Sequence, residues 1–210
     1  MKLLVGNVGT RYMPGVKAAM AKAVERCRTI APVDVMEQPN ISMLPFFGLA
    51  WMRNRLCMQA YEQGYSHVLL VENDVRFDDP DALAQLLMAD KDIIVPAFDF
   101  NYEEDCKVQE PVHPWNLGVQ PLRWAVVSCI MFRCAAFEHI NPAPFENMCI
   151  YLEEETHFQM WRLAGVQAYQ HTDAVVMLLR KPTPLWEVDF TKNQTPGDID
   201  PKRIPYATRH

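Results

Sequence analysis

Apolar and polar positions follow two different periods along the first 96 residues of the chain. Continuous apolar runs predict strands, and apolar residues spaced by three and four predict helices between them. The predicted strands cover 2–8, 33–36, 67–73 and 92–96, and the predicted helices cover about 14–27, 47–63 and 79–88. The strand at 67–73 is apolar at nearly every position, as is typical of a strand covered on both faces of a parallel sheet. The alternating order predicts an α/β fold with a mostly parallel central sheet flanked by helices.

The predicted helices also carry recognisable ends. In the first helix one apolar face consists of Val16, Met20, Val24 and Cys27. Gly64 suits the C-terminal cap of the second helix, where a left-handed backbone is common. For the third helix, Asp79 is expected to be the N-cap and Pro80 the first helical residue, because proline lacks the N–H that this position leaves unbonded.

The second half of the chain is less regular. Residues 97–122 predict a long irregular excursion, 124–132 a further strand, and 153–164 a helix that ends at Gly165. Short strands are expected at 166–170 and 174–179, with a turn between them. We expect a single domain over residues 1–180 and a proline-rich tail over 181–210 that packs on it.

Composition narrows the class of protein. The 210 residues carry a net charge of −6, so no overall positive field attracts nucleic acid or anionic lipid. The apolar runs fall far below the about 20 residues that span a bilayer, which predicts a soluble chain without a transmembrane segment. The six cysteines include no Cys-x-x-Cys pair, so we expect free thiols in a reducing compartment and a cytoplasmic protein.

The acidic sequence Glu72-Asn73-Asp74 follows the apolar strand directly. Ligands of open α/β sheets bind beyond the carboxyl ends of the strands. On an extended backbone Glu72 and Asp74 would point to the same side. Two carboxylates there would hold Mg²⁺ or Mn²⁺, with phosphate oxygens completing the coordination. The alternative is a strand that simply ends in an acidic turn.

The sequence from Trp51 to Phe98 resembles the GT-A glycosyltransferases, particularly those of the family 2 type. Their pattern is an Arg-Asn pair on a helix, a Gly-x-x-His strand that ends in Asp-x-Asp, a helix near Pro-x-Ala-Leu and an Asp-Ile strand. The matching residues are Arg53-Asn54, Gly64, His67, Glu72-Asn73-Asp74, Pro80 to Leu83 and Asp92 to Val95. A second block also resembles the family: the strand at 124–132 and the Glu-Glu-Thr-His-Phe element at 154–158.

The resemblance implies a nucleotide-sugar donor bound near the strand ends. The loop with Thr10 and Arg11 would meet the nucleotide, although a solvated Arg11 is an equal alternative. Arg53 would reach the donor or form a structural salt bridge with a neighbouring carboxylate. Glu72, Asn73 and Asp74 would complete the donor site, with Asp74 and Glu72 as ligands of Mn²⁺ or Mg²⁺.

The resemblance also implies a general base at the start of the late helix. Glu155, or its neighbour Glu154, would take the proton from the acceptor hydroxyl. The alternative is that these acids complement the helix dipole. His157 would face the site or solvent, and Trp115 and Trp124 would each be either a sugar platform or a core residue.

Three positions depart from the family pattern. Glu72 replaces the first aspartate, and Val127-Ser128 replaces glycines that are frequent in the donor pocket. A late histidine that often ligates the metal is replaced by Leu179-Arg180. His171 would substitute for that ligand, or Arg180 would offset the diphosphate charge instead.

The sequence therefore predicts a glycosyltransferase that moves a sugar from a nucleotide-sugar donor to an acceptor hydroxyl with a divalent metal. The acceptor is open: a glycan, a small molecule, a protein or a modified nucleic acid. One alternative is a nucleotidyltransferase, although its usual glycine-rich, basic signature is reduced to Arg11 in the first loop. The other is a non-catalytic relative that binds a nucleotide or glycan.

Overall fold

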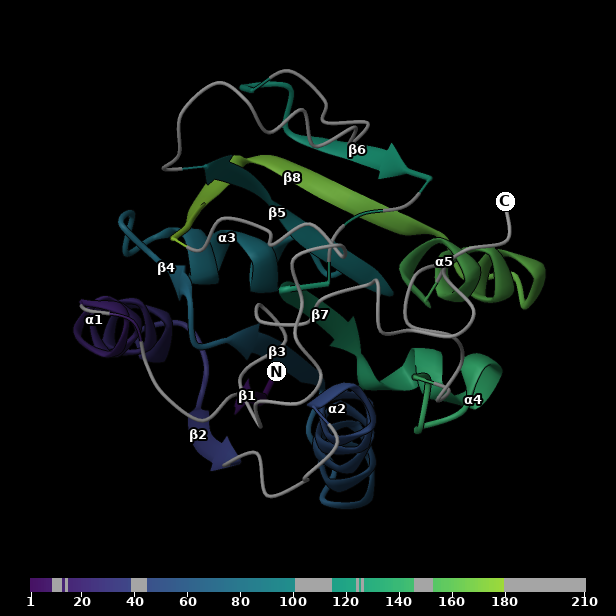
Figure 1. The fold of residues 1–210 in the computed structure, drawn as a ribbon. Helices are drawn as coiled ribbons and strands as arrows, with labels where there is room; N and C mark the ends of the chain where they lie inside the picture. The colour runs from purple at the N-terminus through teal and green to yellow at the C-terminus, as the bar shows by residue number, and fades with distance from the viewer. Residues whose placement is uncertain are drawn as a thin grey trace, which may run out of the picture.

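A computed structural model describes residues 1–8, 13, 15–38, 45–100, 115–123, 125, 127–145 and 153–179, with the backbone alone at 38, 45–49, 100 and 153–156. Helices and strands alternate along this part of the chain (Figure 1). The strands are β1 (Leu3–Val8), β2 (Val33–Gln38), β3 (His67–Glu72), β4 (Val75–Arg76), β5 (Ile93–Phe100), β6 (Val119–Leu122), β7 (Cys129–Arg133) and β8 (Ala168–Leu178). The helices are α1 (Val16–Arg28), α2 (Pro45–Glu62), α3 (Ala82–Met88), the 3₁₀ turn η1 (Cys134–Ala136), α4 (Phe137–Ile140) and α5 (Glu153–Leu163).

The strands of the described part form one sheet in the order β2-β1-β3-β7-β5-β8-β4, with β6 paired to β8. Strands β1, β2, β3, β5 and β8 run in one direction, and β4, β6 and β7 run in the other. The predicted α/β class with a mostly parallel central sheet is therefore confirmed.

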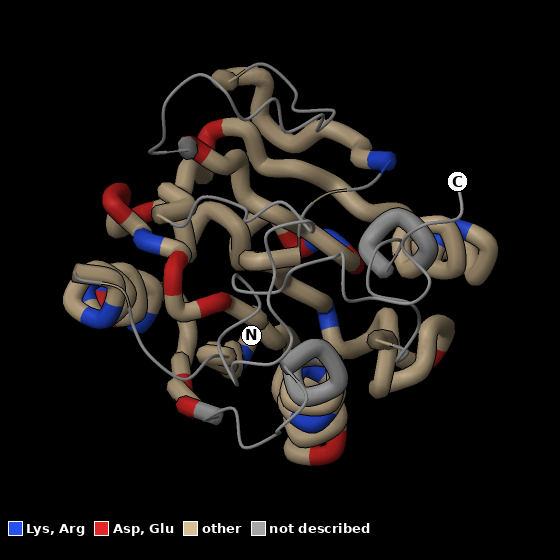
Figure 2. The backbone as a smooth tube through the Cα atoms, viewed as in Figure 1, with Lys and Arg blue, Asp and Glu red and all other residues tan. Residues whose placement is uncertain are grey.

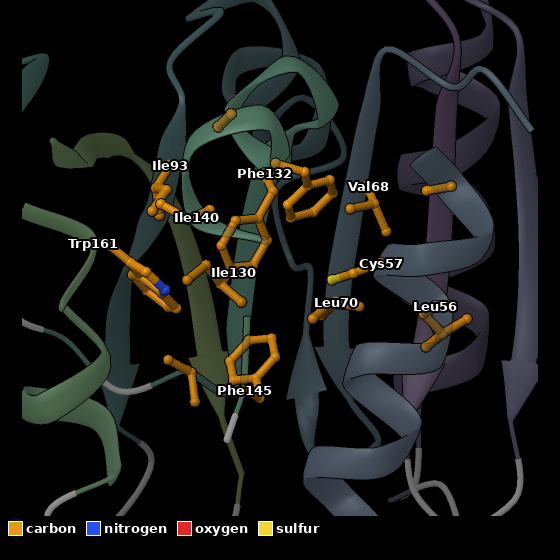
Figure 3. Packing of buried hydrophobic residues seen from close by; sticks show 14 of the residues in the cluster. Leu56, Cys57, Val68, Leu70, Ile93, Ile130, Phe132, Ile140, Phe145 and Trp161 are labelled. Carbon is orange, nitrogen blue, oxygen red and sulfur yellow. The ribbon is translucent and has the colours of Figure 1, made fainter. Parts of the chain in front are cut away.

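Helices cover both faces of this sheet, as Figure 1 shows. One face packs α1 and α3 against alternate residues of the central strands, among them Leu3, Val5, Leu69 and Val71. The other face packs α2 and α5 against the residues between them, such as Leu4, Val68 and Leu70. Figure 3 shows this second core, in which Cys57 of α2 faces β3 and Phe132 of β7 lies between Trp161 and Val68, while Leu56 packs on Gly6 of β1. Burial from both sides explains why β3 is apolar from Val68 to Val71 and why β1 is apolar except at Gly6 and Asn7.

The first predicted helix presents its apolar face as expected, since Val16, Met20, Val24 and Cys27 are all buried. Gly64 follows α2 with a φ of 70°, the left-handed backbone that glycine adopts without strain.

Helix α3 begins at Ala82, later than predicted. Asp79 is not its N-cap, because it closes a turn instead: its Oδ1 accepts from the N–H of Asp81 at 2.9 Å, and its carbonyl accepts from Ala82 at 3.2 Å.

Several later segments also differ from the prediction. Strand β5 continues to Phe100, well into the predicted excursion, and β7 occupies only the end of the predicted strand at 124–132. The two short strands near 170 and 176 are one strand, β8. Its pairing with β5 shifts between Pro96 and Ala97, so three residues of β8 have no partner in β5. That bulge lies where the sequence predicted a turn.

The described cysteines Cys27, Cys57, Cys129 and Cys134 are buried free thiols, as expected. Burial raises the pKa of Cys27 to about 11 and that of Cys134 to about 12, which keeps both protonated. Within the described residues no helix is long and apolar enough to cross a membrane. The predicted tail at 181–210 lies outside the described residues.

Candidate functional site

The carboxyl ends of β1 and β3 lie side by side, because the two strands are parallel and Val8 pairs with Glu72. The acidic sequence after β3 therefore borders the loop that follows β1. That loop carries Thr10 and Arg11, which lie outside the described residues. The sheet edge is where ligands of open α/β sheets bind.

Glu72 is held by partners on two other elements. Its Oε1 lies 2.6 Å from Nη2 of Arg53 in α2, and its Oε2 accepts from the hydroxyl of Ser128 at 3.1 Å. Its backbone N–H donates to the carbonyl of Ser128 at 2.8 Å. The Arg53 side chain is 5% exposed and that of Glu72 21% exposed. Of the two expectations for Arg53, the structure shows the salt bridge, and Glu72 has both carboxylate oxygens engaged.

Asp74 does not share a strand face with Glu72. Asn73 and Asp74 form a turn between β3 and β4, so the expectation of an extended backbone there is wrong. Their carbonyls anchor two other segments: Asn73 accepts from the N–H of Met13 at 2.9 Å and Asp74 from that of Leu179 at 3.0 Å. The Asp74 side chain is buried, with a residue exposure of 4%. The turn separates the roles of the two acids, since Glu72 faces α2 and Asp74 lies beside the end of β8.

His171 does not join these acids. It pairs with Pro96 of β5 and Val119 of β6, whereas the end of β8 that reaches Asp74 pairs with Phe100. Four residues of β5, about 13 Å of strand, separate the partner of His171 from the partner of the β8 end near Asp74. Burial lowers the pKa of His171, against the opposing charge of Asp173.

A preformed metal cage is absent from the part of the chain that the structure describes, where no three His, Cys, Asp or Glu side chains are placed to hold an ion. The roles of Asp74, Glu72 and His171 as metal ligands stay predictions. A single carboxylate suffices chemically for Mg²⁺, which commonly takes one or two carboxylates together with substrate phosphates.

Helix α5 brings the predicted base to the same side of the sheet as α2 (Figure 1). Glu154 and Glu155 lie in its first turn, and their side chains are outside the description. His157 does not face solvent: it is buried at 2% exposure, and its ring stacks on that of Trp161 with centroids 5.8 Å apart. Its burial anchors the start of α5 in the core.

Two further predicted residues are placed away from these acids. His67 is a buried structural residue at the start of β3, with its Nδ1 3.0 Å from the hydroxyl of Ser66. Trp115 is 50% exposed, so the core alternative for it is wrong. Trp124 and Arg180 lie outside the described residues.

Charges of both signs surround the strand ends. Figure 2 shows basic segments on α1 and α2 and acidic segments near the ends of β3 and β4. Arg76 of β4 binds Asp78 through Nε at 2.6 Å and through Nη2 at 2.8 Å. Acidic and basic side chains near these strand ends therefore pair with one another, as Arg76 does with Asp78.

Comparison with known proteins identifies the fold. No family model matches the chain, and no curated protein matches it. S. aureus TarS aligns at 14% identity with a TM-score of 0.55, over 89% of this chain and 38% of that one. The catalytic domain of Drosophila beta1,4-galactosyltransferase 7, in complex with xylobiose, aligns at 14% identity and 0.52, over 86% and 72%. A197 from STIV aligns at 10% identity and 0.49, over 86% and 95%.

The fold is GT-A-like. At these identities the similarity shows the fold alone, and the chain spans well under half of the length of TarS.

Within this GT-A-like fold, two residues matter that the sequence did not single out. Ser128 is a partner of Glu72, although its position in the sequence suggested only a narrower pocket. Phe145 packs against Arg53, with the guanidinium carbon 5.4 Å from the ring centroid. The sequence named Ser128 only as a departure from the family pattern, and its bond to Glu72 comes from the turn that precedes β7. Phe145 follows a proline-rich loop with no periodic signal, so only the folded structure reveals it.

Proposed function

We propose that this protein is a glycosyltransferase that moves a sugar from a nucleotide-sugar donor to an acceptor hydroxyl. The observation that carries the proposal is the acidic turn Asn73-Asp74 at the carboxyl end of β3, beside the end of β1, in a GT-A-like fold. A nucleotide-sugar transferase needs a site for a diphosphate at this edge, and the turn supplies a buried carboxylate there.

The donor site in this proposal is built from the loop after β1 and the acidic sequence after β3. Thr10, Arg11 and Asn73 contact the nucleotide, and Asp74 holds Mn²⁺ or Mg²⁺. The divalent ion, when bound, stabilises the negative charge that develops on the departing diphosphate. Arg53 and Glu72 shape the wall of the donor site through their ion pair.

The acceptor hydroxyl is activated from the first turn of α5. Glu155, with Glu154 as the second candidate, takes the hydroxyl proton. The acceptor oxygen then forms its bond to the anomeric carbon as the bond from that carbon to the diphosphate breaks. The nucleoside diphosphate leaves with the electron pair of the broken bond.

The proposal is tested first by ligand binding. Purified protein is heated with each nucleoside diphosphate, with and without Mn²⁺, and the unfolding temperature is recorded. A diphosphate at 100 times its Kd adds about 2.7 kcal/mol of stability, which is a clear shift. We expect one diphosphate to stabilise the protein in a Mn²⁺-dependent manner. Failure of every diphosphate to shift the unfolding temperature would overturn the proposal, and stabilisation by a triphosphate alone would favour a nucleotidyltransferase.

Matched variants assign the roles. Asp74→Asn should abolish the Mn²⁺-dependent part of the shift, whereas Asp78→Asn, an equal change at an exposed residue of the same region, should retain it. Glu155→Gln and Glu154→Gln are compared for sugar transfer with donor binding as the control. We expect one of them to lose at least about 100-fold in kcat while the diphosphate still binds. Full turnover in both variants would exclude these acids as the base.

A further inference from the structure

The side chain of Asn54 is bound to the main chain of Phe145 at both ends of its amide. Asn54 Nδ2 donates to the carbonyl of Phe145 at 2.5 Å, and the N–H of Phe145 donates to Asn54 Oδ1 at 2.8 Å. The two residues lie 91 positions apart in the chain. This reciprocal pair reproduces the bonding of a strand partner, and we refer to it as the Asn54–Phe145 clamp.

Phe145 has no regular structure of its own to hold it. It ends an irregular stretch after α4, and the residues that follow lie outside the description. Its backbone N–H and C=O are nevertheless satisfied by Asn54, and the residue is 1% exposed. Because a buried backbone group without a partner costs free energy, the clamp is what allows this stretch to enter the core.

The ring of Phe145 contacts Arg53 of α2, which binds Glu72 at the end of β3, and it also contacts helix α5. On one side lies the guanidinium of Arg53, 5.4 Å from the ring centroid and within cation–π range. On the other side lie His157 at 5.6 Å and Trp161 at 5.9 Å, both edge-to-face. Figure 3 shows Phe145 and Trp161 within the core between α2 and α5. Phe145 is thus the contact between the Arg53–Glu72 pair and α5.

Consecutive residues of α2 serve the two connections. Successive helical residues point about 100° apart, so Arg53 reaches Glu72 while Asn54 reaches Phe145. The Arg-Asn sequence therefore joins the end of β3 to the segment that supports α5.

We propose that Asn54 is a positioning residue: through Phe145 it fixes helix α5, and the acids of its first turn, relative to the acidic end of β3. This inference rests on the proposed glycosyl transfer. Asn54 touches neither donor nor acceptor, and it acts by holding the base at a fixed distance from the donor. Misplacement of reacting groups by about 1 Å can cost about 100-fold in rate, so loss of the clamp should lower kcat far more than it weakens donor binding.

The test compares Asn54→Ala and Asn54→Asp with Leu56→Ala. Asn54→Asp keeps an oxygen that accepts from the N–H of Phe145 and loses the N–H that donates to the carbonyl of Phe145. Because one of the two hydrogen bonds remains, this variant should fold even where the alanine variant does not. Leu56→Ala destabilises the same helix at a residue that packs on Gly6 of β1, away from the clamp. Each protein is measured by hydrogen–deuterium exchange, by diphosphate binding and by steady-state kinetics.

We expect both Asn54 variants to speed amide exchange in residues 153–163 at least about 10-fold relative to β1 and β3. We also expect a fall in kcat of about 10- to 100-fold, with a donor KM within about 2-fold of the wild type. Leu56→Ala should raise amide exchange throughout α2 and β1, but it should not lower kcat selectively while KM stays unchanged.

Three results would overturn the inference. Unchanged exchange in 153–163 would show that the clamp does not hold α5. Faster exchange with an unchanged kcat would show that the position of α5 does not govern transfer. A wild-type protein that binds no diphosphate and transfers no sugar would remove the proposed function and the catalytic role together, while the exchange data would still decide whether the clamp exists.

Discussion

Arg53 of α2 and Glu72 of β3 form an ion pair with 2.6 Å between Nη2 and Oε1, although 19 positions separate them in the chain. The pair sits where the sequence alone predicted two metal-binding carboxylates. Ser128 completes the surroundings of Glu72 from the neighbouring strand end. Glu72 is therefore engaged by two side chains, whereas Asp74 lies buried in the turn that follows.

The Arg53–Glu72 pair should show strong energetic coupling. Arg53→Met leaves a largely desolvated carboxylate, and Glu72→Gln leaves a desolvated guanidinium, so each change should cost about 3 kcal/mol of unfolding free energy. The double variant should cost clearly less than the sum, because it leaves no unpaired charge. Urea unfolding of the four proteins measures the coupling.

The exposed pair Arg28–Glu25 on α1 provides the control, with side-chain exposures of 46% and 69%. Its coupling should stay below about 1 kcal/mol. If the losses of unfolding free energy in Arg53→Met and Glu72→Gln simply add in the double variant, the structural role of the Arg53–Glu72 pair is contradicted.

Gly6 of β1 is required by the close approach of α2. A Cβ at Gly6 would lie 2.7 Å from Cδ1 of Leu56, inside any normal contact distance. Gly6→Ala should therefore cost about 1–3 kcal/mol through overpacking. In the background of Leu56→Ala, which removes the obstructing group, the added cost should largely vanish.

Gly64→Ala is the matched control for that experiment. Gly64 has a φ of 70° and no atom near the added Cβ. The loss of stability in Gly64→Ala therefore comes from backbone strain, and Leu56→Ala should not relieve it. An equal cost of Gly6→Ala in both backgrounds would refute the contact as the cause.

His67 should make stability depend on pH. Burial lowers its pKa from 6.5, and Arg133 acts in the same direction, whereas Asp90, 3.3 Å from Nε2, opposes both. The folded state therefore binds fewer protons at this ring than the unfolded chain does, and the unfolding free energy rises with pH. The contribution is complete above about pH 6.5 and is lost as the pH falls below that value.

Urea midpoints at pH 5, 6, 7 and 8 measure this dependence. His67→Gln should reduce the slope below pH 6.5, and the slope that remains should include His171, whose pKa burial also lowers. A slope in His67→Gln equal to that of the wild type would contradict the assignment.

The sequence predicted those helices and strands whose buried residues follow a regular pattern within a short stretch of chain. Strand β3 and helix α1 show this, because a strand covered on both faces must be apolar throughout, and a helix on a sheet must repeat its apolar residues every three or four positions. The GT-A-like arrangement followed from the order of such elements and from the resemblance of the acidic strand end to that family. These are properties of short stretches of chain, which a linear pattern records.

The linear pattern of apolar and polar residues could not predict how distant segments of the chain pair. The bulge that merges two predicted strands into β8 depends on the register against β5. Two sets of bonds join residues far apart in the chain: those of Glu72 to Arg53 and Ser128, and the Asn54–Phe145 clamp. Because a polar side chain finds its partner only when the chain has brought the two together, the sequence named the acids of this site, and the tertiary structure decided which groups bind Glu72 and where Asp74 lies.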